Sequence, residues 1–227
     1  PVIVPTRGAN GGVAWKAIFG NGYNSASGKA VLFVVDLNDA SVRMIEAAES
    51  ATTAPAGSNG LGNLVVVDRF TTTTTNGTTT RRRGRDGMAD IVYGADQKGA
   101  IWKFDLESAA TSVTQPLFTT RTSTEGSLTY RQPITGGMTA VSGLGDGAML
   151  LFGTGSFSFN GDERDTTVQG LYGVNDNFPG QPTSTYTAAN LTPFTVGTTN
   201  GERTMTMGAT PSNRVGWTVT LPTSERF

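Results

Sequence analysis

The stretch DIVYGADQKGAIWKFDL at residues 90–106 decides the fold of this chain. Its first apolar run ends at an aromatic residue and a glycine, a polar turn follows, and a second apolar run ends at an aspartate. Two short apolar runs on either side of a tight turn predict a β-hairpin. Blocks with the same plan occur at residues 15–36 and 148–175. Their second strands end at Asp36, Asp105 and Asn175, which are 69 and 70 residues apart.

A fixed period that contains a strand pair is typical of a repeat architecture. Four-stranded blades repeated around an axis form β-propellers, usually with about four to eight blades. We therefore expect an all-β fold in which this chain supplies about three blades of a larger ring. The chain would be part of a single propeller domain over residues 1–227, with repeats at about 13–60, 61–130 and 131–222. A β-sandwich whose hairpins look alike is the alternative.

Composition limits the chemistry that this chain can perform. The 227 residues include 30 glycines but no cysteine and no histidine, and the formal net charge is −1. Disulfides, thiolate metal sites and histidine-based catalysis are therefore excluded, and any metal site must be built from oxygen ligands, which suit calcium or magnesium. A net charge near zero provides no general attraction for nucleic acid. No apolar run is long enough to span a membrane.

Several segments carry individual expectations. Residues 42–50 are compatible with a short helix or a strand, whereas residues 121–130 and 176–214 are rich in polar and turn residues and are expected to be mostly loop. Residues 69–85 form a low-complexity threonine and arginine insert, expected to be a mobile solvated loop, with binding of anions as the alternative. The three tryptophans lie within predicted strands, so core packing is expected for Trp15, Trp102 and Trp217.

Several phrases resemble one known family. They are WKAIFGNGY from residue 15, LGNLVVVD from residue 61, DIVYGADQKGAIWKFDL from residue 90, LFGTGS from residue 151 and GWTVTLP from residue 216. In this order they are similar to the C-terminal propeller domain of the PilC/PilY family of type IV pilus tip-associated proteins. The resemblance runs from about residue 13 to the end of the chain. It implies a modified β-propeller of the quinoprotein-like type.

The resemblance also implies a function. The chain would be a non-enzymatic module acting in pilus biogenesis and in adhesion to surfaces or host cells, located at the bacterial cell surface, at the pilus tip or the outer membrane, after secretion through the periplasm. Its partners would be pilus subunits or minor pilins and an unidentified surface receptor. The alternative from a different class is a propeller enzyme, either a quinone-dependent dehydrogenase or a glycoside-active protein.

The family further carries a calcium loop of the form D-x-D-x-D-G-x-x-D between two strands. Asp68 matches its first aspartate, Asp86 its central one and Asp90 its last, while the Met88 carbonyl would face the ion. The second aspartate has no counterpart, because residues 69–85 interrupt the loop there. An arginine from 81–85 is the alternative neutralising group. A separate acidic cluster is more typical of a solvated turn than of a catalytic pair, and consists of Asp162, Glu163 and Asp165.

Overall fold

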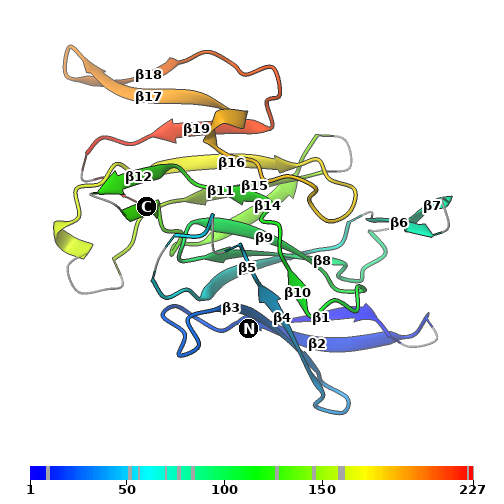
Figure 1. Ribbon diagram of the computed structural model, residues 1–227. Helices are drawn as coiled ribbons and strands as arrows, with labels where there is room; N and C mark the ends of the chain where they lie inside the picture. Colours follow the sequence, from blue (N-terminus) through cyan, green and yellow to red (C-terminus); the bar gives the residue numbers. More distant parts are fainter. Residues whose placement is uncertain are drawn as a thin grey trace.

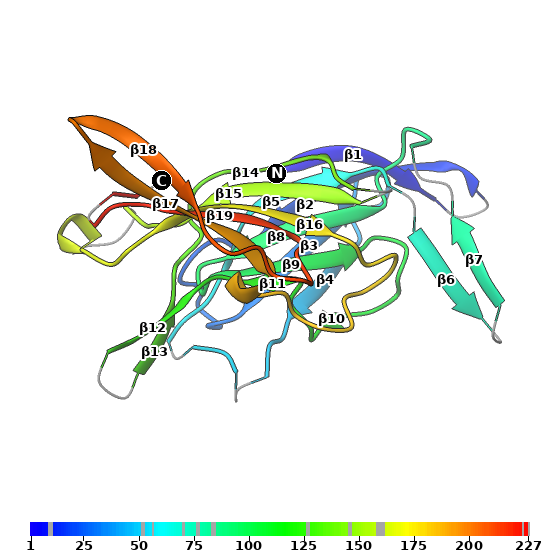
Figure 2. The same cartoon turned by 90° about the horizontal axis from the view of Figure 1, so that it is seen from above.

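The computed structural model describes most of the chain, in the ranges 1–8, 11–50, 53–55, 57–69, 71–75, 78–82, 85–125, 128–144, 147–157, 162–223 and 225–226. Side chains of residues 71–75, 79–82, 123–125 and 128–129 lie outside this description. Three larger β-sheets follow one another in chain order and stack face to face (Figures 1 and 2). They do not close into a ring, so the all-β prediction of a partial propeller is confirmed.

The first sheet is an antiparallel meander to which one short strand is added in parallel. Its strands are β1 (Val2–Arg7), β2 (Val13–Gly20), β3 (Ala30–Asp36), β4 (Val42–Ala47) and β10 (Ser112–Val113). Residues 42–47 are thus a strand, which settles the choice between helix and strand for this segment. Tertiary pairing along both edges outweighs the modest helix propensity of so short a segment.

The second sheet lies between the other two. Its order is β11-β9-β8-β5, with β5 (Leu61–Val67), β8 (Ile91–Asp96), β9 (Ala100–Asp105) and β11 (Phe118–Thr119). Side chains alternate between its faces, so Val92, Trp102 and Phe104 enter one core cluster while Ile91, Tyr93 and Ile101 enter another. Burial on both faces explains why this hairpin is apolar almost throughout.

The third sheet is larger. Its order is β14-β15-β16-β19-β17-β18, with β14 (Met138–Ser142), β15 (Ala148–Gly153), β16 (Gly170–Asp176), β17 (Leu191–Thr199), β18 (Glu202–Met207) and β19 (Gly216–Thr220). The same register relates the three sheets, because Lys16 faces Asp36, Ile91 faces Asp105 and Met149 faces Asn175. The hairpin repeat predicted from the sequence is therefore present in space.

Short elements complete the structure. They are the hairpin strands β6 (Thr71–Thr75) and β7 (Thr78–Arg82), the hairpin strands β12 (Thr122–Glu125) and β13 (Leu128–Arg131), and the 3-10 turns η2 (Asp162–Arg164) and η3 (Ala188–Asn190). The loop prediction for residues 121–130 is wrong, since they hold most of a hairpin. Residues 176–214 lie mostly outside strands, as predicted, but they also hold β17 and β18. The β12 and β13 strands pair with each other in a local hairpin, whereas β17 pairs with β18 and also with β19.

The tryptophans differ in their surroundings. Trp102 is fully buried and its Nε1–H donates to the Asp96 carboxylate at 2.9 Å, so this core prediction is confirmed. Trp15 is 53% exposed, and the prediction that it packs in the core is wrong. It lies on the outer face of the first sheet with Val13, Val42 and Met44, which are also exposed, and none of the described sheets covers this face.

Candidate functional site

The candidate calcium loop lies where β5 ends and β8 begins. These strands are antiparallel neighbours, and Val67 faces Ile91 at the end of their ladder. The chain leaves this point after Asp68, forms the β6–β7 hairpin away from the body, and returns at residue 85 (Figure 1). Because adjacent strands lie about 4.8 Å apart, the two ends of the insert meet whatever its length. The structure therefore brings the two flanks of the insert together.

The Asp68 carboxylate holds the two flanks of the insert together. One of its oxygens accepts a hydrogen bond from the Arg85 backbone N–H, and the other accepts from the Gly87 N–H at 2.7 Å. Gly87 has a φ of +85°, a conformation that glycine adopts without steric cost. Asp86 Oδ1 accepts in turn from the Met88 N–H at 3.1 Å. These backbone contacts give residues 85–88 a defined turn conformation.

Asp90 is the buried member of the group, with 2% of its surface exposed. Its Oδ2 accepts a hydrogen bond from the Arg69 backbone N–H at 3.0 Å. Burial raises the pKa of Asp90 to about 6, the hydrogen bond from Arg69 opposes this rise, and the negative charges of Asp68 and Asp86 add to it. The hydrogen bonds from Arg69 to Asp90 and from Gly87 to Asp68 place the backbone segments that carry Asp68, Asp86 and Asp90 next to one another.

Among the side chains that the structure describes, Arg7 from β1 lies beside this loop. Its guanidinium pairs with Asp86, and its Nε lies 2.7 Å from Glu107 Oε1. The sequence prediction placed a neutralising arginine within residues 81–85. The side chains of residues 81–84 lie outside the described part of the chain, and the contact of Arg85 with Asp68 uses the backbone N–H. Arg7 could not be found from the sequence, because 79 residues separate it from Asp86. Only the packing of the first sheet beside the second brings the two residues together.

The fit of this loop to calcium can be tested on its donor atoms. Carboxylate and carbonyl oxygens are the ligands that calcium prefers. In the part of the chain that is described, no group of three or more acidic side chains is close enough to ligate one ion. Arg7 already pairs with Asp86 at this position. The donor types therefore fit calcium, while the arrangement requires Asp86 to exchange Arg7 for the ion.

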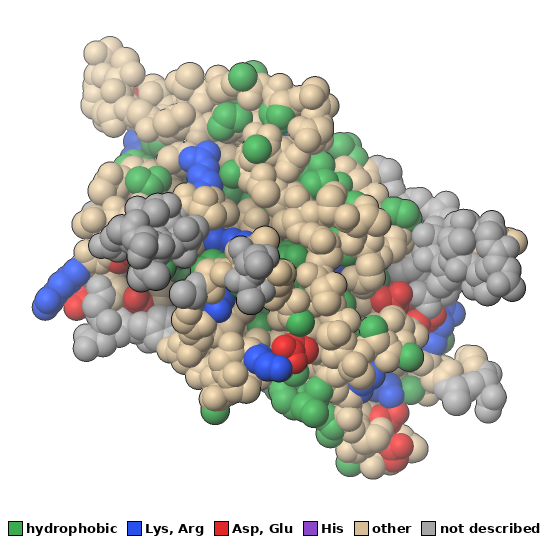
Figure 3. Space-filling view, viewed as in Figure 1, with side chains coloured by type: hydrophobic (Ala, Val, Ile, Leu, Met, Phe, Trp, Pro, Cys, Tyr) green, Lys and Arg blue, Asp and Glu red, His purple; other side chains and the backbone are tan. Residues whose placement is uncertain are grey.

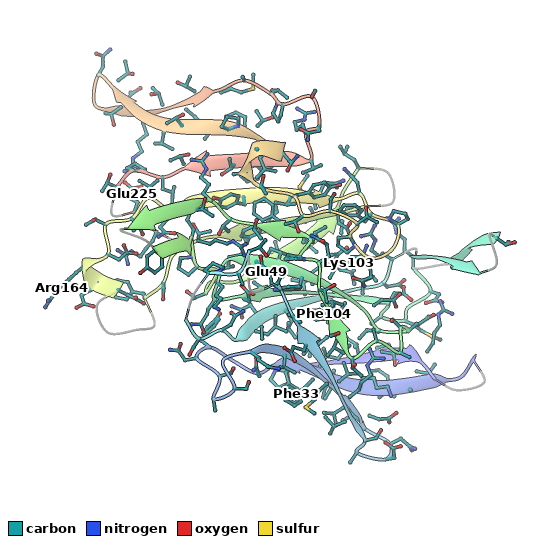
Figure 4. The ribbon with its side chains drawn as sticks, viewed as in Figure 1. Phe33, Glu49, Lys103, Phe104, Arg164 and Glu225 are labelled. Atoms are coloured by element: carbon teal, nitrogen blue, oxygen red, sulfur yellow. The ribbon has the colours of Figure 1, made fainter. Side chains whose placement is uncertain are left out.

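A buried charged cluster lies directly behind the loop. Asp176 is fully buried, and its Oδ2 accepts hydrogen bonds from the Tyr93 hydroxyl at 2.7 Å and from the Arg69 guanidinium. The Lys103 ammonium lies 2.9 Å from the same oxygen and donates to the Phe178 carbonyl at 2.8 Å (Figure 4). Burial lowers the pKa of Lys103, whereas the charge of Asp176 opposes this fall.

This cluster joins the second sheet to the third. Arg69 and Asp176 are 107 residues apart in sequence. The sequence prediction assigned residue 69 to a solvated insert, but Arg69 is 8% exposed and belongs to the core. No local signal distinguishes it from the arginines that follow. The cluster stabilises the stacking of two sheets, because each charge is compensated only when both sheets are in place.

The other acidic residues singled out from the sequence occupy turns. Asp162 lies in the 3-10 turn η2, where Arg226 donates hydrogen bonds to the carbonyls of Asp162 and Asp165. Asp165 accepts from the Thr167 N–H at 2.8 Å. These contacts agree with the prediction that the cluster around residue 162 is a turn. They tie it to the end of the chain through Arg226.

Comparison with known proteins supports the structural assignment. The PilY1 beta-propeller domain family matches residues 2–202. The type IV pilus biogenesis factor PilY1 homolog of Xylella fastidiosa is 38% identical over 194 residues, which are 78% of this chain and 12% of that protein. The type IV pilus biogenesis factor PilY1 of Pseudomonas aeruginosa is 26% identical over 183 residues, which are 71% of this chain and 14% of that protein.

A solved structure has the same fold. The crystal structure of the Pseudomonas aeruginosa PilY1 C-terminal domain matches 100% of this chain and 51% of its own, with a TM-score of 0.62 and 22% sequence identity. The chain thus spans about half of that domain and a small part of the curated relatives. The family match covers all of the first two sheets and most of the third. The chain therefore belongs to the PilY1 beta-propeller family.

Proposed function

We propose that this chain is a propeller module of a type IV pilus-associated protein and that it acts in pilus biogenesis without catalysing a reaction. The observation that carries the proposal is the family match over residues 2–202, together with relatives named type IV pilus biogenesis factors. The charged groups behind the loop are compatible with a structural role, because Asp176 pairs with both Arg69 and Lys103 between two sheets.

The cavities bear on the enzyme alternative. Three of those between described residues have volumes of about 190, 230 and 190 Å³. Typical small-molecule sites occupy about 300–1,000 Å³. The enzyme alternative is tested by the visible absorbance of the purified full-length protein, with and without added quinone cofactor. A bound quinone band, or turnover of a sugar or alcohol substrate, would overturn the proposed role.

The proposal extends to location and partners. We expect the module to act at the bacterial cell surface, at the pilus tip or the outer membrane, after secretion through the periplasm, and to contact pilus subunits or minor pilins and a surface receptor. The relatives' names support a connection with the pilus. Among the described residues, no helix has the length and apolar character needed to cross a membrane.

A genetic experiment tests the role in biogenesis. In a bacterium that produces the full-length protein, the module would be disabled by Asp176→Asn and compared with Glu202→Gln, a change on an exposed strand. Electron microscopy should show fewer pili in the first strain at equal amounts of the protein on immunoblots. Normal piliation in the Asp176→Asn strain, with the module shown to be unfolded by protease sensitivity, would refute the proposal.

We further propose that the loop binds calcium through the carboxylates of Asp68, Asp86 and Asp90 and the carbonyl of Met88, once Asp86 releases Arg7. The position of Asp90 beside the turn that carries Asp68 and Asp86 supports this, and the charges of those two residues contribute to raising the pKa of Asp90. A bound divalent cation would relieve this repulsion. Binding of the ion and pairing with Arg7 are therefore in competition for the same side chain.

Isothermal calorimetry with calcium chloride tests the calcium proposal. The wild type should release heat that is absent in Asp90→Ala, and Arg7→Gln should bind the ion more tightly because the competing cation is gone. Lys29→Gln, which changes an exposed lysine paired with Glu46, is the matched control. If neither the wild type nor Arg7→Gln binds calcium, the site does not exist in this chain.

A further inference from the structure

The outer edges of the three sheets differ in how they end. The first sheet ends at β10 and the second at β11, and each of these strands has only two residues. The edge of the second sheet is also covered by Tyr186, whose carbonyl accepts from the Thr119 N–H at 2.9 Å. The third sheet ends at β18, which has six residues, all exposed, and pairs on one side with β17 (Figure 1).

The free side of β18 presents a regular row of backbone groups. The Gly208 N–H donates to the Pro193 carbonyl at 2.8 Å, and the register places Met207 opposite Phe194 and Met205 opposite Val196. In an antiparallel ladder, bonded and non-bonded pairs alternate along the strand. Counting back from Gly208, the N–H and C=O groups that point outward therefore belong to Arg203, Met205 and Met207.

The same strand carries an exposed apolar face. Met205 and Met207 are 61% and 62% exposed, and they lie directly across from Val196 and Phe194 on one face of the hairpin. This face continues onto β19, where Val219 lies opposite Phe194. Figure 3 shows hydrophobic side chains on the upper part of the molecule, where β17 and β18 lie. Methionine side chains adapt well to the shape of a partner.

Among the described residues, the Thr204–Met207 part of β18 lacks the usual protection of an edge strand. Native edge strands are commonly blunted by lysine, by proline, by bulges or by being short. The stretch from Thr204 to Met207 has no charge and no proline, and its register with β17 is unbroken. The charged residues Glu202 and Arg203 lie at the tip, where the Arg203 guanidinium donates to Glu225 at 2.9 Å.

Ring neighbours would leave this edge open. In this fold the sheets cover one another by their faces, as the second sheet shows with a core cluster on each side. The β14 strand lies at the opposite edge of the third sheet from β18. The second sheet has four strands and leaves all six residues of β18 in the six-stranded third sheet exposed. A further blade of the same width on the other face would likewise leave β18, with Met205 and Met207, accessible.

We propose that β18 is a docking edge for an extended strand of a partner protein, which adds to the third sheet and places apolar side chains beside Met205 and Met207. The free N–H and C=O groups select extended polypeptide rather than a helix, a glycan or a lipid. The apolar face selects a strand with apolar residues at alternate positions. This inference does not depend on the proposed role in pilus biogenesis.

A second copy of this chain is a poorer occupant. Two copies of β18 could pair antiparallel so that the outward backbone groups of all three residues are bonded. Met205 would then lie opposite Met205, and Arg203 would lie opposite Met207 at both ends. Each pairing of this kind sets a charge against the apolar face, which costs free energy when the charge loses water. The edge therefore suits a neutral strand of a different protein.

The experiment uses a soluble probe and residue-specific detection. The probe is a capped peptide in which valine and threonine alternate between terminal lysines, and its control has proline in place of each threonine. Hydrogen exchange followed by NMR should show slower exchange of the Arg203, Met205 and Met207 amides on adding the probe. The amides of Thr204 and Thr206, which already bond to β17, should be unchanged, and the proline control should have no effect.

Two variants make the outcome decisive. Met205→Pro removes one outward N–H and should weaken binding of the probe about fivefold or more, the loss expected for one hydrogen bond. Met205→Lys keeps the N–H and introduces an edge charge, so it serves if the proline variant is misfolded, and should also weaken binding. The proposal would be overturned by unchanged exchange at all three amides, or if both variants bound the probe as tightly as the wild type does. Self-association of the protein that Met205→Pro abolishes would also overturn it.

Discussion

Replacing Asp176 by asparagine should destabilise this protein more than removing either of its cationic partners. Asp176 is fully buried and is the negatively charged partner of both Arg69 and Lys103. Asp176→Asn therefore leaves two buried cations without an anion. Removing one partner of a buried ion pair costs about 3–5 kcal/mol, because the remaining charge is uncompensated. We expect the free energy of unfolding to fall by about this amount.

Arg69→Met provides the comparison within the same cluster. It removes one of two cations and leaves Asp176 paired with Lys103 at 2.9 Å, so one anion and one cation remain and the cluster becomes electrically neutral. The free energy of unfolding should fall by about 1–3 kcal/mol, mainly from hydrogen bonds to Tyr93 and Asp176 that are lost. The order of the two variants, rather than either value alone, tests whether charge compensation holds the sheets together.

The pH dependence of Asp176→Asn gives a second test. Burial lowers the pKa of Lys103 in the folded protein below its unfolded value of about 10.4. Between these two values the unfolded chain binds more protons than the folded one, so stability rises with pH. Loss of the Asp176 charge lowers the folded pKa further and widens this window. The difference in free energy of unfolding between the wild type and Asp176→Asn should therefore shrink as the pH is raised from 7 toward 10.

Urea unfolding followed by tryptophan fluorescence measures all of these variants. Glu202→Gln, on an exposed strand, is the control and should stay within about 0.5 kcal/mol of the wild type. If Arg69→Met is as destabilising as Asp176→Asn, the arginine acts through packing and the reasoning from charge fails. The reasoning also fails if Asp176→Asn behaves like the control.

Three further predictions use the same assay. Trp102→Ala should lower stability by about 3–5 kcal/mol, because it empties a fully buried site and leaves Asp96 without one of its donors; a cost near zero would contradict the described core. Trp15→Ser should change stability by less than about 0.5 kcal/mol, since this side chain is 53% exposed, and a large loss would mean that the face is covered in solution. The pKa of Asp90 is raised to about 6 in the folded protein, above the unfolded value of about 4. Ionisation of Asp90 is therefore less favourable in the folded state, and the free energy of unfolding falls as the pH rises from about 4 to 6. With a chelator present, Asp90→Asn should exceed the wild type by up to about 3 kcal/mol above pH 6 and match it near pH 4; a constant difference across this range would exclude the titration of Asp90 as its cause.

The sequence predicts those parts of the fold whose signal is local. The hairpin at residues 90–106 is apolar on both faces and has a tight turn, so its strands follow from alternation and turn chemistry. The β17–β18 hairpin does not, because Pro193, Gly197 and several threonines read as loop until pairing with β19 is known. The prediction that Trp15 packs in the core is wrong for a similar reason. Its position in a strand is predictable, but whether another layer covers that face is a property of the whole assembly.

The candidate site also has parts that the sequence predicts and parts that it does not. The closeness of the chain segments that carry Asp68 and Asp90 follows from two flanking strands that are neighbours in one sheet. The cations do not follow, since Arg7 reaches Asp86 from another sheet and Arg69 reaches Asp176 across 107 residues. Long-range ion pairs of this kind are fixed by packing, and a sequence pattern carries no record of them.

The contacts of Asp68 with Arg85 and Gly87 have a consequence for how the insert between β5 and β8 can vary in length. Because the Asp68 carboxylate bonds to both Arg85 and Gly87, the body of the second sheet is complete without the β6–β7 hairpin. Loops whose ends are held together tolerate changes in length at little cost in free energy. This position is therefore a permissive point for acquiring or losing sequence. A fluorescent or affinity tag inserted between Thr75 and Thr78 should leave the fold intact and report on the protein where it works.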